Sequence, residues 1–544
     1  MKKIIILVSI TILAFFLRIY LVNQNPPSLN WDEVSHGYNA YSILKTGKDE
    51  WGIKFPLIFR AYGDYKLPLY IYLTAISEFF FGLNPLSVRL ISILSGTGLV
   101  LLSFLIAKEI TKENKYALFA AFLTALSPWS LFLSRIAVEA NLGAVLFASG
   151  AYFAIKWLKS GDKKYLIFCS IFLGFSLHAY NSARVLIPIF FVLMLIFGLK
   201  FNKIKTLIFP GLILIIFSLP LIFQLINHSA EARYDLVSLI DQGVINQIIE
   251  KQTKSGLPKP LPKLIFNKVT FFSVFTIKNY LQNISPRYLF LRGGNQFQFS
   301  FPDHELLYLI TAPFLLLGLV KIFCKSNRQE KFLGIWFLTA FIPSAITKDA
   351  PHVLRSILVL PSPMILSALG LQLTVNFLKE KSKFGGKLLI SVLVLAVLVS
   401  FGRWWNDYFN IYPRAYSWSW QYGYKQTVFY IKDNYEKYDK IFFTKKYGEP
   451  HEFVLFYYPW LPSKYQDDPQ KKWDHHASWY WVDGFDKFVF INDWEVIEGV
   501  KCERGSGKCL LITSPGNYPK GWTKIKTIDF LDGGPAFEIL ENRN

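Results

Sequence analysis

Two adjacent carboxylates, Asp32 and Glu33, follow shortly after the first long apolar run of the chain, residues 4–22. Acidic side chains this close to a hydrocarbon layer are costly to place and therefore indicate a function. A carboxylate suits the role of a general base, which accepts the proton of a hydroxyl group while that group attacks another centre. We predict that this acidic pair belongs to a catalytic site.

The same stretch also has the pattern of a helix start. Asn30 is a preferred N-cap residue, and Glu33 stands three residues later, where a capping-box glutamate belongs. The local pattern supports a cap and a catalytic site equally well. A helix start can also serve as a site, because it holds its acidic residues on rigid backbone.

Long apolar runs dominate the first three quarters of the chain. Of the 544 residues 52% are hydrophobic, and 50 are phenylalanine. Runs of roughly 14 to 22 residues recur, long enough to cross a bilayer as helices, the shorter ones with a few flanking residues. We predict a polytopic α-helical membrane protein with about eleven transmembrane helices. The runs are 4–22, 88–107, 116–133, 142–157, 165–179, 185–199, 207–226, 306–323, 332–346, 354–375 and 388–401.

Basic loops alternate along this series of runs. Five connecting loops are basic and fall on the side of Lys2 and Lys3, which predicts a cytoplasmic N-terminus and an outer C-terminal region. In a membrane protein, the net charge of +21 is more typical of such orientation signals than of nucleic-acid binding. The loops contain Lys108, Lys112 and Lys115; Lys159, Lys163 and Lys164; Lys200, Lys203 and Lys205; Lys325, Arg328 and Lys331; and Lys379, Lys381, Lys383 and Lys387.

One further apolar stretch, residues 67–83, does not fit as a span. It contains Pro68 and Glu78, and a crossing here would move every later basic loop to the outside. We therefore expect an interfacial or re-entrant helix on the outer leaflet. The largest outer loops are then residues 23–87 and 227–305.

The outer loops carry acids and cations near the membrane, all facing one compartment. If the substrate is a sugar on a lipid phosphate, the acceptor hydroxyl needs a carboxylate base, and the phosphate leaving group needs cations. Each cation has an alternative role as an anchor that snorkels to the interface. The candidate catalytic acids are Asp32, Glu33 and Glu139, and the candidate phosphate-binding residues are Arg60, Lys66, Arg89, Arg135, His352 and Arg355.

The composition changes near Arg403. We predict a transmembrane domain over residues 1–404 and a small extracytoplasmic α/β domain over 405–544. Segments 440–445, 453–457, 487–491 and 510–513 have strand patterns, and 423–435 has a helix pattern. Cys502 and Cys509 form either a disulfide, as an oxidising outer compartment permits, or two unpaired thiols.

An ordered set of short motifs resembles the C-type (GT-C) membrane glycosyltransferases, in particular the protein O-mannosyltransferases and the lipid A aminoarabinose transferases. Trp31-Asp32-Glu33 with the residues to Ala40 resembles the first-loop signature of this family, an acidic pair that opens a helix. Each motif alone is weak, but the order of the set is fairly specific. The other motifs are 64–70, which includes Asp64 and Lys66, then 81–90, 135–139 and 351–355.

The resemblance implies a polyprenyl-phosphate sugar donor, inverting transfer to an acceptor hydroxyl and a first-loop aspartate as base. It favours Asp32 over Glu33 for that role and implies that Lys66 contacts the donor phosphate. It implies neither a nucleotide sugar nor an obligatory metal, so we expect no cofactor. Two departures concern donor binding: Glu139 replaces the usual aspartate, and Ser35 stands where some relatives have an arginine.

This interpretation predicts a multi-pass protein of the plasma or inner membrane with its active site on the extracytoplasmic face. The acceptor is a protein, a lipid or a glycan. One alternative is a metal-dependent oligosaccharyltransferase-like enzyme in which Asp32 and Glu139 bind a divalent ion. Another is a transporter or flippase of lipid-linked sugars, but its ionisable residues belong in mid-span, whereas most charges here lie at the ends of the runs.

Overall fold

The structure is a computed structural model of the 544-residue chain. It describes residues 2–63, 65–200, 204–226, 236–324, 326–382, 384–476, 479–502 and 507–542. Asp64 of the second motif and the basic-loop residues Lys203, Lys325 and Lys383 lie outside these ranges. The described residues form two compact units, and each unit is built from segments that are far apart in the sequence.

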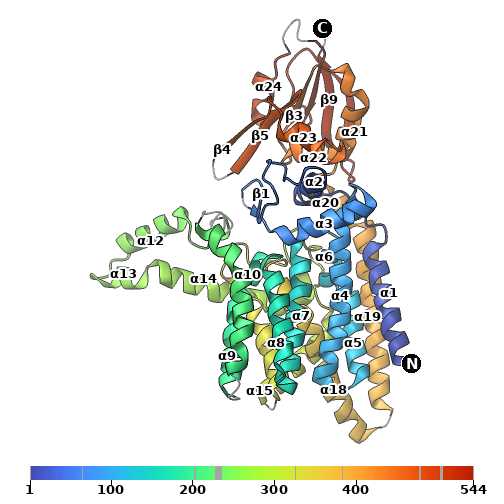
Figure 1. Ribbon diagram of the computed structural model, residues 1–544, viewed down its shortest axis with the longest axis vertical. Coiled ribbons are helices and arrows are strands. Elements are labelled where there is room, and N and C mark those ends of the chain that lie inside the picture. The colour runs from blue at the N-terminus through green and yellow to red at the C-terminus, as the bar shows by residue number, and fades with distance from the viewer. Residues whose placement is uncertain are drawn as a thin grey trace. The chain divides into compact units, whose positions relative to one another are not determined.

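The first unit is helical and comprises residues 1–18, 92–134 and 139–404. In Figure 1 its helices α5, α7, α8, α9 and α18 run side by side. Its elements are α1 (Lys2–Ile19), α5 (Asn114–Leu126), α6 (Pro128–Ser134), α7 (Glu139–Ser160), α8 (Lys163–Leu177), α9 (Asn181–Lys200), η1 (Ile204–Leu207), α10 (Ile208–Ile226), α12 (Gln242–Lys254), α13 (Leu261–Ile265), α14 (Lys268–Asn283), η2 (Arg287–Arg292), η3 (Leu309–Thr311), α15 (Ala312–Cys324), α16 (Arg328–Thr339), α17 (Ile342–Ala345), η4 (Ile357–Val359) and α18 (Ser362–Lys381). Two long helices, α4 (Pro85–Thr111) and α19 (Gly385–Asn410), begin or end in the other unit.

Six helical segments in the described part of the chain are long and apolar enough to cross a membrane, and a seventh is added if the bent pair α5 and α6 is one span. The bend of this pair is 52°. These helices make the chain a helical membrane protein, while the predicted number of eleven spans and their orientation stay predictions. The stretch we expected to be interfacial is the short apolar helix α3 (Pro68–Phe81).

Arg18 differs from a snorkelling side chain, because the first unit buries it completely. Its guanidinium donates hydrogen bonds to the carbonyls of Ala14, Ala125 and Thr124 and to the hydroxyl of Ser130. Backbone carbonyls near helix ends and breaks supply acceptors that hydrocarbon lacks, which explains how a charged side chain can be buried here.

The second unit comprises residues 19–91, 135–138 and 405–544. It therefore joins the segment predicted as the first outer loop to the C-terminal segment. Its elements are α2 (Trp31–Thr46), β1 (Phe59–Arg60), β2 (Tyr65–Lys66), α3, α20 (Tyr412–Tyr416), η5 (Ser417–Trp420), α21 (Tyr424–Asn434), η6 (Tyr435–Lys437), β3 (Lys440–Thr444), α22 (Pro450–Tyr457), α23 (Pro462–Gln466), β4 (Lys472–His476), β5 (Trp479–Phe485), β6 (Phe488–Ile491), η7 (Asp493–Glu495), α24 (Val496–Gly499), β7 (Cys509–Thr513), β8 (Trp522–Asp529) and β9 (Pro535–Asn542).

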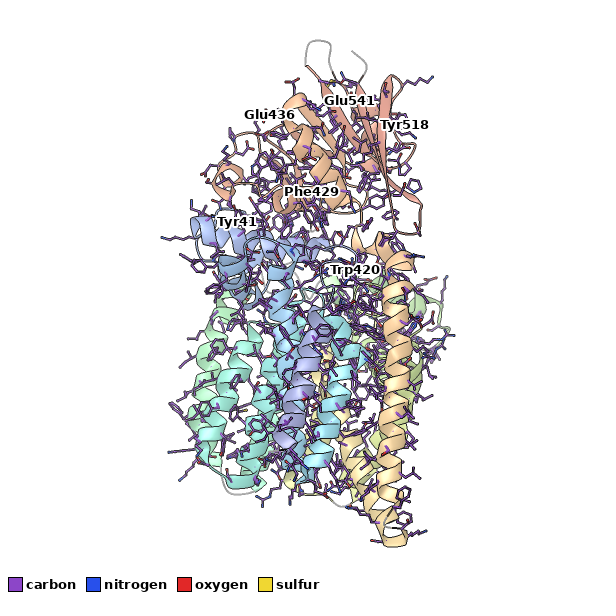
Figure 2. The ribbon with its side chains drawn as sticks, turned by 90° about the vertical axis from the view of Figure 1, so that its right-hand side faces the viewer. Tyr41, Trp420, Phe429, Glu436, Tyr518 and Glu541 are labelled. Atoms are coloured by element: carbon purple, nitrogen blue, oxygen red, sulfur yellow. A yellow bond between two sulfur atoms is a disulfide. The ribbon has the colours of Figure 1, made fainter. Side chains whose placement is uncertain are left out.

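A seven-stranded mixed sheet with the order β4-β5-β6-β3-β7-β9-β8 forms the framework of this unit. The central strand β3 pairs in parallel with β6 and β7, and every other pairing in the sheet is antiparallel. Figure 2 shows α21, which carries Phe429, beside the strands that end near Glu541. Tyr424 of α21 packs its ring against Phe443 of β3 and Phe537 of β9, which fixes this helix on the sheet.

Helix α2 packs directly against α22 and α23 of the same unit. A Cβ atom at Gly37 of α2 would lie 2.5 Å from a ring carbon of Phe456, so only glycine permits this approach. Gly448, just before α22, has a φ of +121°, and a Cβ atom there would lie 2.4 Å from a ring carbon of Trp31. Helix α2 is therefore in close contact with α22 at Gly37 and with the residue before α22 at Trp31.

The predicted secondary structure of the C-terminal segment is correct for β3, β6, β7 and α21 and wrong for residues 453–457. That stretch belongs to helix α22, which has Pro450 at its first turn and is buried on all sides. A fully buried helix shows no polar face, so its apolar run cannot be distinguished by periodicity from a buried strand.

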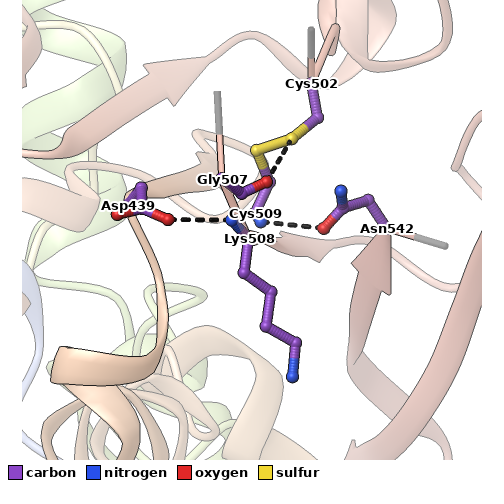
Figure 3. The surroundings of a disulfide bond; sticks show 6 residues. All are labelled: Asp439, Cys502, Gly507, Lys508, Cys509 and Asn542. Atoms are coloured by element: carbon purple, nitrogen blue, oxygen red, sulfur yellow. Dashed lines mark hydrogen bonds between the residues drawn. A yellow bond between two sulfur atoms is a disulfide. The ribbon is translucent and has the colours of Figure 1, made fainter. Parts of the chain in front are cut away.

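Cys502 and Cys509 form a disulfide at the start of β7, rather than remaining two unpaired thiols (Figure 3). The backbone amide of Lys508 donates to Asp439 at 2.8 Å, and that of Cys509 donates to Asn542 at 2.8 Å. Of the other cysteines, Cys169 is buried and Cys324 is exposed.

Candidate functional site

The N-terminus of α2 has the capping box that the sequence predicts. The Asn30 side chain accepts a hydrogen bond from the Glu33 amide at 3.0 Å, and Glu33 accepts one from the Asn30 amide at 3.1 Å. Asp32 is the second residue of the helix, where the aligned peptide dipoles favour a negative charge. The capping role therefore belongs to Glu33, while Asp32 stands beside it with its side chain directed elsewhere.

Asp32 and Lys66 form an ion pair. The Nζ atom of Lys66, on the two-residue strand β2, lies 2.5 Å from Oδ1 of Asp32. The Asp32 side chain keeps 27% of its surface exposed, and that of Lys66 keeps 10%. When a hydroxyl displaces a phosphate, a base accepts the hydroxyl proton and a cation stabilises the phosphate. Asp32 and Lys66 supply these two groups side by side.

Glu33 and Arg89 form a second ion pair that is fully buried. The Nε and Nη2 atoms of Arg89 lie 2.8 and 2.9 Å from the two carboxylate oxygens of Glu33. Glu33 also accepts the amide of Ala137 at 2.7 Å, and Arg89 donates to the carbonyls of Val22 and Ser28. This network ties the start of α2 to α4, and it occupies both oxygens of Glu33.

Arg135 and Arg60 are engaged within the same unit. Arg135 is buried, donates to the carbonyls of Tyr20 and Asn25 at 2.8 and 2.7 Å and faces the ring of Tyr408. Arg60 lies over three aromatic rings, those of Trp51, Trp473 and Tyr480. Both cations thus have protein partners that hold them in place, and Lys66 is the predicted cation nearest to the Asp32 carboxylate within the described part of this unit.

The remaining predicted site residues belong to the helical unit. Glu139 is the first residue of α7. The backbone amide of His352 donates to Ser344 at 3.1 Å, and its ring lies near that of Phe299. Arg355 donates to the hydroxyl of Thr347 and to the carbonyl of Lys348. The catalytic and phosphate-binding roles of these residues stay predictions.

Aromatic side chains surround the start of α2. The Tyr62 hydroxyl donates to the carbonyl of Trp31 at 2.7 Å, and the Tyr62 ring stacks on Trp479 of β5. Burial, reinforced by the carboxylates of Glu452 and Asp32, raises the pKa of Tyr62 well above its ordinary value, so its hydroxyl remains a donor at neutral pH. Rings of this kind give a binding site an apolar wall beside its few polar groups.

A second group of ionisable side chains in this unit went unnoticed in the sequence. Glu50, His451 and Glu452 are buried together. Burial raises the pKa of Glu50 to about 7 and lowers that of His451 to about 3. The only hints in the sequence are the adjacent His451-Glu452 after a proline and the Asp49-Glu50 pair in the first loop; 400 residues separate the two halves, and no spacing rule connects them.

Part of the chain is similar to enzymes that use lipid-linked sugars. Residues 66–223 match the family model of dolichyl-phosphate-mannose-protein mannosyltransferase. The undecaprenyl phosphate-alpha-4-amino-4-deoxy-L-arabinose arabinosyl transferase of Wigglesworthia glossinidia brevipalpis is 31% identical over 209 residues. That match covers 37% of this chain and 36% of the relative, so the chain matches about a third of the length of the curated protein.

Two solved structures share the fold. ArnT from Cupriavidus metallidurans bound to undecaprenyl phosphate has a TM-score of 0.51 at 11% identity, over 99% of this chain and 98% of that one. The archaeal oligosaccharyltransferase AglB from Archaeoglobus fulgidus, in complex with an inhibitory peptide and a dolichol-phosphate, has a TM-score of 0.53 at 14% identity. That alignment covers 84% of this chain and 63% of AglB. The fold is therefore that of the GT-C membrane proteins.

Proposed function

Because the chain is a GT-C protein that resembles the protein O-mannosyltransferases and the aminoarabinose transferases, we propose that it is an integral-membrane glycosyltransferase. It transfers a sugar from a polyprenyl-phosphate-linked donor to an acceptor hydroxyl. Asp32 is the general base, and Lys66 binds the donor phosphate. The observation that carries this proposal is the partly exposed Asp32–Lys66 pair at the N-terminus of α2.

The reaction is a single displacement. The acceptor oxygen attacks the anomeric carbon of the donor, the bond from that carbon to the phosphate oxygen breaks, and the hydroxyl proton passes to Asp32. The lipid phosphate leaves with the bonding electrons, and because attack and departure occur on opposite faces, the configuration inverts. The ammonium group of Lys66 has three N–H donors, so it can donate to a bound phosphate as well as to Asp32. A bound phosphate therefore draws the ammonium group away from the Asp32 carboxylate.

Two observations support an extracytoplasmic site. The basic loops favour an outer location for the first loop and the C-terminal segment. The Cys502–Cys509 disulfide belongs to the same compact unit as Asp32 and fits an oxidising compartment. Protein, lipid and glycan remain the acceptor classes of this proposal.

A metal-dependent oligosaccharyl transfer is the second candidate, favoured by the fold shared with AglB. Its ligands are predicted to be Asp32 and Glu139. Asp32 belongs to the second unit and Glu139 to the helical unit. A chelator separates the two candidates: loss of transfer in chelator favours the metal-dependent enzyme, and unchanged transfer favours the metal-free displacement.

The test compares Asp32→Asn with wild type. We expect cells that lack the protein to accumulate its lipid-linked donor, and wild type to restore turnover of that lipid. We expect Asp32→Asn to insert and fold normally but to lose transfer by about 10²–10⁴-fold, the usual contribution of a positioned base. Asp433→Asn, at an exposed residue of α21, is the matched control and keeps full activity. Full turnover by Asp32→Asn would remove Asp32 from the mechanism.

A further inference from the structure

Three side chains of metal-ligating type converge in the second unit. Glu50 comes from the turn after α2, and His451 and Glu452 come from the first turn of α22. One ligand atom of each lies within 4.8 Å of the other two. Their exposed fractions are 1%, 2% and 1%.

The two carboxylates of this group lack a partner that balances them. Oε1 of Glu50 accepts from the Asn39 amide at 3.0 Å, but Oε2 of Glu50 and Oε2 of Glu452 accept no hydrogen bond from any residue that the structure describes. Burial raises the pKa of both groups; the charge of Asp49 adds to this at Glu50, and the charges of Glu50 and Glu449 add to it at Glu452. Lys471 attracts Glu50 electrostatically, yet its Nζ lies 3.4 Å from the carbonyl of Gln466 and over the ring of Tyr465.

The imidazole of His451 lies between two buried carboxylates. Its Nε2 lies 3.8 Å from Oε1 of Glu452, and its Nδ1 lies 3.5 Å from Oε2 of Glu449. Glu449 is itself held by the indole N–H of Trp479 at 2.7 Å. The Nδ1 atom of His451 makes no hydrogen bond to any residue that the structure describes. A buried ring nitrogen without a hydrogen-bond partner is available to a metal.

We propose that Glu50, His451 and Glu452 bind one divalent cation of the zinc class. One imidazole nitrogen and two carboxylate oxygens are a donor set typical of Zn²⁺, whereas Mg²⁺ and Ca²⁺ prefer oxygen alone. A bound dication neutralises the two buried carboxylates, which would otherwise be costly to keep charged.

The role of this site is structural. It joins the turn that ends α2 to the helix that packs along α2, where Gly37 meets Phe456 and Gly448 meets Trp31. Glu50 bonds to Asn39 and Glu452 interacts with Ser35, so the metal holds the N-terminal half of α2, which also carries Asp32. Metal content and unfolding temperature test this role without a measurement of transfer.

The test measures metal in the full-length protein, purified in detergent without a histidine tag. We expect close to one zinc per chain by elemental analysis. Extraction with a chelator lowers the unfolding temperature, Zn²⁺ restores it, and Mg²⁺ does not. Less than a tenth of an equivalent of bound metal, together with an unfolding temperature that ignores both chelator and added Zn²⁺, overturns the proposal without any variant.

Variants assign the metal to these residues. His451→Gln and the double variant Glu50→Gln with Glu452→Gln lose the zinc. Asp493→Asn changes a carboxylate of the same unit that has several donors, and it keeps the zinc. Asp32→Asn also keeps it; loss of zinc from that variant alone would instead assign the metal to the proposed catalytic site.

Discussion

Helix α2 has carboxylates at both of its ends, and the two groups differ in what faces them. At its start, Asp32 faces Lys66 and Glu33 faces Arg89, so each acid has a cation within hydrogen-bond distance. Beyond its end, Glu50 faces Glu452 and a neutral histidine. In the first group, side chains of the protein balance the negative charges. In the second group, a bound cation would balance them.

The difference also separates accessibility from burial. The Asp32 side chain is 27% exposed, whereas Glu33, Glu50 and Glu452 are 0–1% exposed. A general base must be accessible to its substrate. A carboxylate that only stabilises the fold does not need to be accessible. Of the four acids, Asp32 is therefore the one whose surroundings suit proton transfer, and the other three suit positioning.

The largest effect is expected from Arg89→Met. This change leaves the Glu33 carboxylate buried without its cation, which costs about 3–5 kcal/mol of unfolding free energy. Denaturant unfolding followed by tryptophan fluorescence measures it, since Arg89 lies over the ring of Trp420. The predicted phosphate-binding role makes a different forecast: donor KM rises and the unfolding free energy stays at the wild-type value.

The second prediction compares glutamate-to-glutamine changes at the two ends of α2 in metal-free protein. Glu33→Gln weakens a satisfied ion pair and lowers the unfolding temperature. Glu452→Gln removes one of two facing buried carboxylates, and we expect an unfolding temperature equal to or above that of chelated wild type. Differential scanning fluorimetry with and without chelator measures the direction of the change in unfolding temperature for each variant. A fall of similar size in both variants would mean that the two ends of α2 are equivalent.

The sequence predicts those contacts whose partners are close together in the chain. The capping box at Asn30 and Glu33 and the disulfide between Cys502 and Cys509 follow from short spacings, and both are present. Segments 440–445 and 510–513 were predicted as strands because they are short apolar runs bounded by turn residues, and the structure forms β3 and β7 there. Residues 453–457 were assigned wrongly because burial on every side of α22 removes the helical period.

Longer-range partners could not be predicted. Arginine is a residue type that often binds phosphate, which is why Arg89 and Arg135 were predicted to do so. In the structure they donate instead to backbone carbonyls and, for Arg89, to Glu33. These acceptors are distant in sequence and come close only in the folded chain. Glu50 and His451 are brought together by packing between α2 and α22. No pattern within either segment specifies the other.

The third prediction concerns Lys66→Met. The Asp32–Lys66 pair is partly exposed, so we expect its loss to change the unfolding free energy by about 1 kcal/mol or less. Transfer should suffer more, because a hydrogen bond to a charged group contributes about 1.5–3 kcal/mol, or roughly 10–150-fold in kcat/KM for the lipid-linked donor. Lys66→Arg restores part of this activity. An unchanged kcat/KM in Lys66→Met would exclude the phosphate contact.

The smallest effect is expected at Asp493, a carboxylate that is satisfied by donors rather than by a metal. Burial alone would raise its pKa, but hydrogen bonds from Ser514, Thr444 and Lys446 prevail and lower it. A folded-state pKa below the unfolded one contributes stability above the unfolded pKa, and this contribution is lost as pH falls through the folded pKa. Asp493→Asn should therefore unfold about 1 kcal/mol more easily at pH 7. Since the wild-type advantage requires the carboxylate, the difference between the two proteins shrinks toward zero below about pH 3.8. Unfolding temperatures from pH 7 down to 3 measure it, and a difference that stays constant over this range would assign the effect to shape rather than to charge.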